Sequence, residues 1–320
     1  MSTSSRIDRE RIRRTLTFWL RPAFLLRALT RFQRITGFDR AVALASGTLT
    51  ALIPLAIVIS SLLPNADAAS TARKIIGRYS LTGAGADAVR SLFSPAGGDV
   101  TGISVVGALL LVIAMLSFSR SMQRLFEQTW ELTPLSVRNT PNDLLWLAGL
   151  VAYIALSWGI HRLIDRGAVQ IVSNALLVPA SAVFLLWTGW VLSARRVARR
   201  SLAPFAIVGA IVLAVYLTGA AAYAPHLFSS YASRYGAVGA VFAMISTLFG
   251  LMVALVGSAA LGREVFEELS RIRRGEVPPE DEVRREWDAL LDQGRLRWQT
   301  LRKRVDRRRH SSSPDDHRAP

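Results

Sequence analysis

The sequence predicts an all-α, polytopic membrane protein with six transmembrane helices, and three observations support this fold class. Six long apolar stretches contain no Asp, Glu, Lys or Arg. Each is about as long as a helix needs to cross a ~30 Å hydrocarbon core at ~1.5 Å per residue. None alternates apolar and polar residues as a barrel strand does, and a helix satisfies its own backbone hydrogen bonds in lipid. The stretches are 41–63, 102–118, 144–160, 175–194, 202–224 and 237–261.

The distribution of basic residues predicts how these spans are oriented. The chain has 39 Lys and Arg and a net charge of +16, which in a soluble protein would suggest nucleic-acid binding. However, 32 of the 39 lie before the first stretch, after the last, or in alternate loops such as 195–201. Basic residues near span ends are retained in the cytoplasm, so we expect both termini inside. The orientation of the spans and the attraction to anionic headgroups then explain the excess of basic residues, and we expect no nucleic-acid partner.

The terminal segments are predicted to be amphipathic helices. We expect a basic N-terminal segment over 1–40 that lies on the inner membrane surface, with its Trp and Phe side chains at the headgroup level and its Arg side chains extended toward water. The six-helix domain covers 41–261. A basic helical tail covers 262–310, and the Ser-, Pro- and Asp-rich end over 311–320 is expected to be disordered.

The tail has an approximate heptad pattern over 283–305. This pattern is typical of a coiled coil, which would make the protein a homo-oligomer through 283–305. Gly294 weakens the seam, and the many Arg residues that follow favour a helix on the membrane surface. Both interpretations stay open, with surface binding slightly favoured.

Small residues at helical spacing predict where the helices pack. Lipid is as apolar as a leucine side chain, so membrane helices associate through close contact at small residues. The stretches at 41–63, 202–224 and 237–261 have the clearest ribbons and are expected to form the centre, whereas Trp146, Trp187 and Trp190 are expected to face lipid or its interface. The packing candidates are Gly47, Ala210, Ala214, Gly239, Ala243 and Gly262.

Polar residues within the spans are few, and we expect some of them to line a polar pathway. Pro54 interrupts the first span, and a proline inside a helix frees a carbonyl and usually kinks the helix. The kink could open a crevice or could be a packing adaptation, because nearby hydroxyls can bond the freed backbone. The candidates for the pathway or kink are Thr50, Pro54, Ser60, Tyr216, Tyr223 and Ser246.

Three stretches resemble the YihY/BrkB family of bacterial inner-membrane proteins. They are the run from Ala45 to Pro54, the segment from Ser117 to Trp130, and the last span with its flanks. The most specific pattern is Tyr235-Gly236 before that span and Gly262-Arg263-Glu264 after it. The resemblance covers about 25–270 and implies six spans, a bacterial plasma-membrane location and no settled activity. Members carry the labels ribonuclease BN, virulence factor and transporter.

One departure from the family pattern lies in the first span. Relatives tend to have an aromatic residue at the position that is filled here by Thr48 or Leu49. A ligand role for this span is therefore doubtful.

The residues present disfavour an enzyme. Metal-assisted cleavage of RNA needs clustered His and carboxylate ligands, and metal-independent cleavage needs a general acid and base in one pocket. The chain has four histidines without metal-ligand spacing and no cysteine, so we expect no catalytic residue, no cofactor and no metal site. A ribonuclease is the function class that this composition argues against most directly.

Two functions remain open. The first is a transporter or permease of an unknown solute or lipid, although the spans lack the ionisable groups of a proton relay and show no inverted repeat. The second is a non-transporting envelope or scaffold protein that acts through its tail and oligomeric state. Among the polar residues near span ends, Glu264 is a candidate for an ion pair with Arg120 or Arg124 at the inner mouth, or else an ordinary interfacial charge.

Overall fold

Every element in the described part of the chain is a helix. The computed structural model describes residues 11–62, 100–134, 140–164 and 170–276, together with isolated positions at 70–90 and 281–292. The chain divides into two compact units. Unit 1 joins the residues up to Arg31 with those from Glu268 onward, and unit 2 spans Phe32–Glu267. The described positions within 283–292 are helical, whereas the rest of the predicted helix over 283–305 and the end at 311–320 lie outside the described residues. The side chain of Ser60, a predicted pathway residue, lies outside the described side chains as well.

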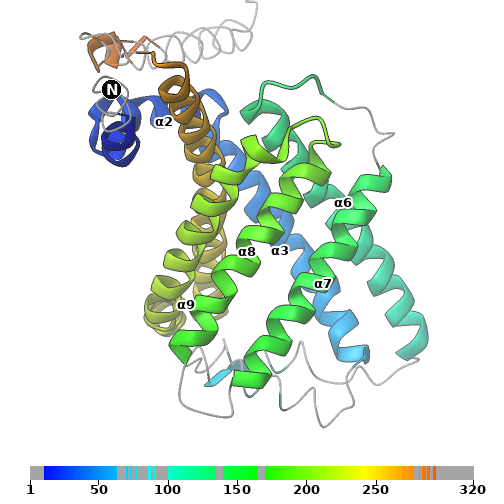
Figure 1. Cartoon of the computed structure of the whole chain (residues 1–320). Coiled ribbons are helices and arrows are strands. Elements are labelled where there is room, and N and C mark those ends of the chain that lie inside the picture. Colours follow the sequence, from blue (N-terminus) through cyan, green and yellow to red (C-terminus); the bar gives the residue numbers. More distant parts are fainter. Residues whose placement is uncertain are drawn as a thin grey trace, which may run out of the picture. The chain divides into compact units, whose positions relative to one another are not determined.

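The helices follow the predicted apolar stretches. In unit 2, α3, α6, α7, α8 and α9 lie side by side as a bundle (Figure 1), and α6 contacts α3, α7 and α8. The elements are the 3-10 helix η1 (Phe18–Leu20), α2 (Pro22–Arg34), α3 (Gly37–Leu62), α6 (Val100–Thr129), α7 (Thr140–Ile164), α8 (Gln170–Leu192) and α9 (Arg199–Arg274). The predicted all-α class is confirmed.

Several of these helices are apolar enough to cross a membrane. Three have the required length and composition, over Val105–Thr129, Arg199–Gly236 and Val241–Arg274. Two shorter apolar helices cover Pro141–Ser157 and Leu177–Leu192. The chain is therefore a helical membrane protein, and its exact number of spans stays a prediction.

Helix α9 consists of two arms that fold back on each other at Gly236. This residue has φ 61° and ψ −139°, a conformation open almost only to glycine, and the second arm returns beside the first (Figure 1). The segment 225–235, which connects the two last apolar stretches, is helical as well. The first arm thus runs unbroken from Arg199 to Tyr235.

Contacts between the two arms of α9 show their antiparallel register. A Cβ added at Gly262 would lie 2.3 Å from Phe205 Cα, and one at Gly250 would lie 2.6 Å from Tyr216 Oη. Between these points, a Cβ at Gly209 would lie 3.6 Å from the Ser258 side chain. Small residues on one arm therefore let the backbone of the other approach closely, as expected for helices that associate in lipid.

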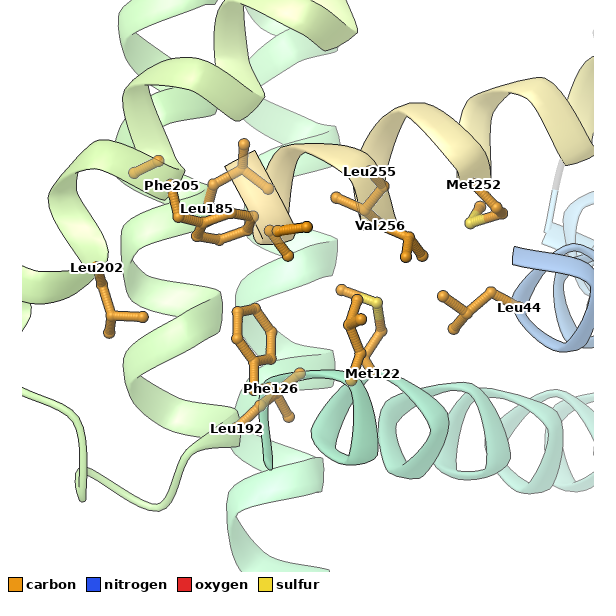
Figure 2. Packing of buried hydrophobic residues seen from close by; sticks show 14 of the residues in the cluster. Leu44, Met122, Phe126, Leu185, Leu192, Leu202, Phe205, Met252, Leu255 and Val256 are labelled. Carbon is orange, nitrogen blue, oxygen red and sulfur yellow. The ribbon is translucent and has the colours of Figure 1, made fainter. Parts of the chain in front are cut away.

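The best-packed core of unit 2 lies at one end of the bundle, where α6 and α8 end and where α3 and α9 begin. Phe126, Leu192, Leu202 and Phe205 are fully buried there and point toward one another (Figure 2). The ring of Phe126 meets that of Phe205 edge-on, with centroids 5.3 Å apart. Toward the other end many apolar side chains are exposed, such as Val105, Leu109, Val215 and Phe242, as lipid-facing residues of a membrane protein are.

The expectation that the tryptophans face lipid is wrong for Trp146. This side chain is 3% exposed, and its Nε1–H donates a hydrogen bond to Thr188 Oγ1 at 3.2 Å. Trp187 is partly buried and packs over Gly149, where a Cβ would lie 2.0 Å from the ring. Bundle packing overrides the interfacial preference of tryptophan here. Gly149 leaves room for the Trp187 ring, and Thr188 accepts the hydrogen bond of the Trp146 indole.

Candidate functional site

A cavity lies between the two arms of α9. Its volume is about 270 Å³. It is lined by Tyr216, Gly219, Ala220, Tyr223, Ala224, Leu227, Ser246 and Thr247. We refer to it as the α9 groove.

The spacing of side chains on the first arm explains why the arms part at this point. Tyr216, Gly219, Ala220 and Tyr223 are three, four and seven residues apart and therefore share one face of the helix. Gly219 and Ala220 are too small to fill the space between the two tyrosines, and a Cβ added at Gly219 would meet nothing within 4 Å. The gap between two large side chains becomes the groove.

The two tyrosines occupy different positions in this groove. Tyr216 is half-buried, and its hydroxyl donates a hydrogen bond to the backbone carbonyl of Thr247 at 2.5 Å while the ring packs on Gly250. Tyr223 is 63% exposed, and Ser246 on the opposite arm is exposed as well. Tyr216 is thus fixed between the arms, whereas Tyr223 and Ser246 present hydroxyls where the groove opens.

The predicted polar pathway is brought together only in part. Tyr216, Tyr223 and Ser246 line the α9 groove. Thr50 and Pro54 lie on α3 and are not among the lining residues. Pro54 is buried, and the hydroxyl of Thr50 donates to the Ser46 carbonyl of its own helix at 2.9 Å, as membrane-helix hydroxyls commonly do.

The chemistry of the lining sets what the groove can hold. Its residues are alanine, glycine, leucine and four hydroxyl side chains, and none is charged. Nor does the described part of the chain contain a group of three or more His, Asp or Glu side chains that could hold a metal ion. An apolar or weakly polar molecule fits this lining, because its neutral groups could bond the hydroxyls without a buried charge.

A buried carboxylate that sequence reasoning missed lies near the end of α6. Glu127 is 5% exposed, accepts a hydrogen bond from Gln123 Nε2 at 2.9 Å, and pairs with Arg196 Nη2 at 3.3 Å. Arg196 also donates to the carbonyl of Thr133 at 2.6 Å. This arginine therefore ties the loop between α8 and α9 to the end of α6. The pair lies outside the uncharged stretches, so a search of the spans could not find it.

A second buried carboxylate, Asp143, lies at the start of α7. It is 2% exposed and accepts a hydrogen bond from Ser119 Oγ at 2.8 Å. Asp143 is acidic and in the first turn of its helix, where a negative charge is favoured by the helix dipole. Like Glu127, it joins neighbouring helices at the well-packed end of the bundle.

The three residues of the predicted inner-mouth ion pair differ in their burial. Arg120 and Arg124 are exposed, and Arg120 interacts electrostatically with Asp143. Burial and the positive charge of Arg124 lower the pKa of Arg40. Glu264 is 2% exposed, which is unusual for a carboxylate. Its pairing with Arg120 or Arg124 stays a prediction.

The predicted packing residues lie at several helix contacts. Gly262 meets the backbone of Phe205, and a Cβ at Gly239 would lie 2.0 Å from the carbonyl oxygen of Tyr231, across the reversal at Gly236. A Cβ at Gly47 would lie 3.9 Å from the Phe118 ring, which is ordinary contact between α3 and α6. Ala210 and Ala243 are 1% exposed, and Ala214 is partly buried.

These features define a helical membrane protein with several apolar helices, the last of which folds back on itself at Gly236. Residues 28–279 match the family described as Virulence factor BrkB, and the chain belongs to that family. The match confirms the resemblance seen in the sequence. Neither the curated proteins nor the solved structures contain a match to this chain.

Proposed function

We propose that the protein is a transporter or permease of a lipid-like solute, which it takes up at the α9 groove. The observation that carries this proposal is the uncharged, hydroxyl-bearing lining of the groove between two apolar helices. A molecule with an apolar body and a neutral polar group matches this lining, whereas an ion would lose its hydration without a counter-charge.

The proposal includes six spans in a bacterial plasma membrane with both termini in the cytoplasm. It is supported by the 32 basic residues that lie outside the spans on one predicted side, including the four arginines of 195–201. The chain contains no cysteine, so single cysteines report topology without background. Ser80→Cys should react with a membrane-impermeant maleimide in whole spheroplasts, and Ser312→Cys should react only after lysis.

The transport proposal is tested with purified protein in liposomes that contain a fluorescent phospholipid. Dithionite added outside reduces only outer-leaflet lipid, so lipid movement appears as extra loss of fluorescence. Gly219→Leu places a large side chain into the α9 groove, where a Cβ meets nothing within 4 Å. Gly257→Leu is the matched control, because its Cβ also has open space and Gly257 does not line the groove.

We expect lipid movement with the unchanged chain and with Gly257→Leu, and its loss with Gly219→Leu at equal reconstitution. Equal movement in the two variants would contradict a role for the groove. If the unchanged protein moves no lipid, the non-transporting envelope or scaffold function gains support. That function predicts a cellular phenotype on deletion of 280–310, whereas transport should survive that deletion.

A further inference from the structure

The part of α2 that belongs to unit 1 buries two polar side chains beside Ala23 and Phe24, and it exposes two leucines. Its buried residues include Arg27, 7% exposed, and Thr30, 5% exposed. Its exposed residues include Leu25 and Leu29, which are 60% and 47% exposed. A helix on a water-soluble surface does the opposite and turns its leucines inward. The two exposed leucines, opposite buried polar residues, indicate that the outward face of this helix is not in contact with water.

An ion-pair cluster holds the charged face inward. Arg27 Nη2 donates to Glu268 Oε2 at 2.8 Å, and both side chains are nearly inaccessible. Arg14 Nη2 donates to the other carboxylate oxygen of Glu268 at 3.3 Å, and Arg271 Nη1 lies 3.8 Å from Oε2. Burial of a charge is tolerated only where it is paired and hydrogen-bonded. Glu268 therefore allows α2 to keep Arg27 inside.

Aromatic packing closes the interior of the same unit. Phe18 and Phe24 are each 1% exposed and meet edge-on, with ring centroids 5.0 Å apart. Trp19 lies edge-on to Phe24 at 5.5 Å. The expectation that the phenylalanines of this segment reach the headgroups is therefore wrong for Phe18 and Phe24, and the buried arginine Arg27 does not extend toward water. The segment folds into a small core instead.

Unit 1 also has an exposed apolar surface, next to exposed arginines such as Arg11 and Arg13. Its members are spaced three or four residues apart within each helical run and are 43–82% exposed, the highest value being that of Leu20. We call them the leucine face: Ile12, Leu16, Trp19, Leu20, Leu25 and Leu29. Large exposed apolar patches with a polar surround mark contact with a membrane or a partner.

The charge of unit 1 selects the occupant. The segments 11–31 and 268–276 contain nine arginines and two glutamates. Such a charge attracts an anionic bilayer surface and repels a second copy of the same unit. We propose that the leucine face inserts into the interface of an anionic phospholipid bilayer, and that the cluster of Arg14, Arg27, Glu268 and Arg271 keeps this face turned outward. This proposal is independent of any transport by the groove.

The test uses the full chain with a single cysteine, labelled with an environment-sensitive fluorophore and reconstituted in vesicles. Leu25→Cys reports on the leucine face, and Arg273→Cys is the control, because Arg273 is an exposed polar residue of the same unit. Vesicles contain either phosphatidylcholine alone or equal parts phosphatidylcholine and phosphatidylglycerol. The label is quenched either by lipids with a nitroxide on the acyl chain or by iodide in the buffer.

We expect the label at position 25 to shift to the blue and to be quenched by the nitroxide lipid but hardly by iodide. The label at position 273 should behave in the opposite way, and the difference should be larger with phosphatidylglycerol. Equal iodide quenching at both positions would overturn the proposal. Protection from both quenchers at position 25 would also overturn it, because the face would then be covered by the chain itself or by a second copy.

The cluster is tested with Glu268→Gln in the Leu25→Cys background. Removal of the carboxylate takes away the negative charge that Arg27 and Arg14 share at Glu268, so the segment should detach and the nitroxide quenching at position 25 should be lost. Glu267→Gln is the control, because Glu267 pairs with Arg263 one turn earlier on α9 at 3.0 Å. Size-exclusion chromatography separates this local effect from global unfolding. Unchanged quenching in Glu268→Gln, with an intact elution profile, would refute the role of the cluster.

Discussion

The two arms of α9 approach each other closely at Gly262, so a substitution at this residue tests how the arms pack. In Gly262→Ala the new Cβ would lie 2.3 Å from Phe205 Cα and 2.6 Å from Phe205 N. Both neighbours are backbone atoms, so no side-chain rotation relieves the contact. Carbon atoms in good contact are about 3.5–4.0 Å apart, and the arms must therefore separate by about 1 Å.

The expected loss of stability follows from two opposing effects. Overpacking of a close-packed site costs about 1–3 kcal/mol. Replacement of glycine by alanine inside a helix returns about 0.5–1 kcal/mol. The middle values of these two ranges give a net destabilisation of about 1 kcal/mol, which in a domain of this size lowers Tm by about 2–4 °C.

The matched control lies five residues earlier on the same arm. A Cβ added at Gly257 meets nothing within 4 Å, so Gly257→Ala should keep Tm or raise it slightly. Both variants are heated in detergent, and unfolding is followed by the fluorescence of the eight tryptophans. An equal Tm for Gly262→Ala and Gly257→Ala would refute the contact between the α9 arms at Phe205.

Three further changes test other features of unit 2. Thr188→Val removes the acceptor of the buried Trp146 indole and should lower stability by about 1–3 kcal/mol in the same thermal assay. Arg196→Ala removes the guanidinium that pairs with the buried Glu127 carboxylate, and we expect a loss of about 1–3 kcal/mol and faster proteolysis of the loop between α8 and α9. Gly236→Ala forces a side chain into a conformation with φ 61° and should cost about 1–3 kcal/mol.

Each of these changes has a control from the same part of the chain. Thr218→Val alters an exposed threonine that bonds the Ala214 carbonyl of its own helix. Arg200→Ala alters an exposed arginine near Arg196, and Gly219→Ala adds a Cβ in open space. If a test variant has the same Tm as its control, the contact that the variant removes does not stabilise the bundle. For Gly236→Ala, an equal Tm would show that the backbone conformation at Gly236 does not require glycine.

The sequence predicted the helices well because lipid imposes simple requirements. An uncharged stretch such as 202–224 has no stable form in a membrane other than a helix or a closed barrel strand, and its lack of alternation excludes the strand. The motif around Tyr235-Gly236 and Gly262-Arg263-Glu264 was sufficient to recognise the family, which the match over 28–279 confirms. These features are local, so they can be read without knowledge of which helices are neighbours.

The sequence was a weaker guide to the candidate site. It singled out Tyr216, Tyr223 and Ser246, but it grouped them with Thr50 and Pro54, which do not line the α9 groove. Residues with hydroxyls can serve as ligands or can bond their own helix, as Thr50 does. Composition does not distinguish these roles, because the choice depends on the helix that lies opposite.

By itself, the sequence determined that this protein is an all-helical membrane protein of the BrkB family, and it predicted the sides on which its loops lie. Only the tertiary structure decided that Trp146 is buried, that Glu127 pairs with Arg196, and that α2 turns Arg27 inward toward Glu268. The physical reason is the range of the interactions. Partition into lipid depends on one segment at a time, whereas burial of a polar group depends on a partner far along the chain.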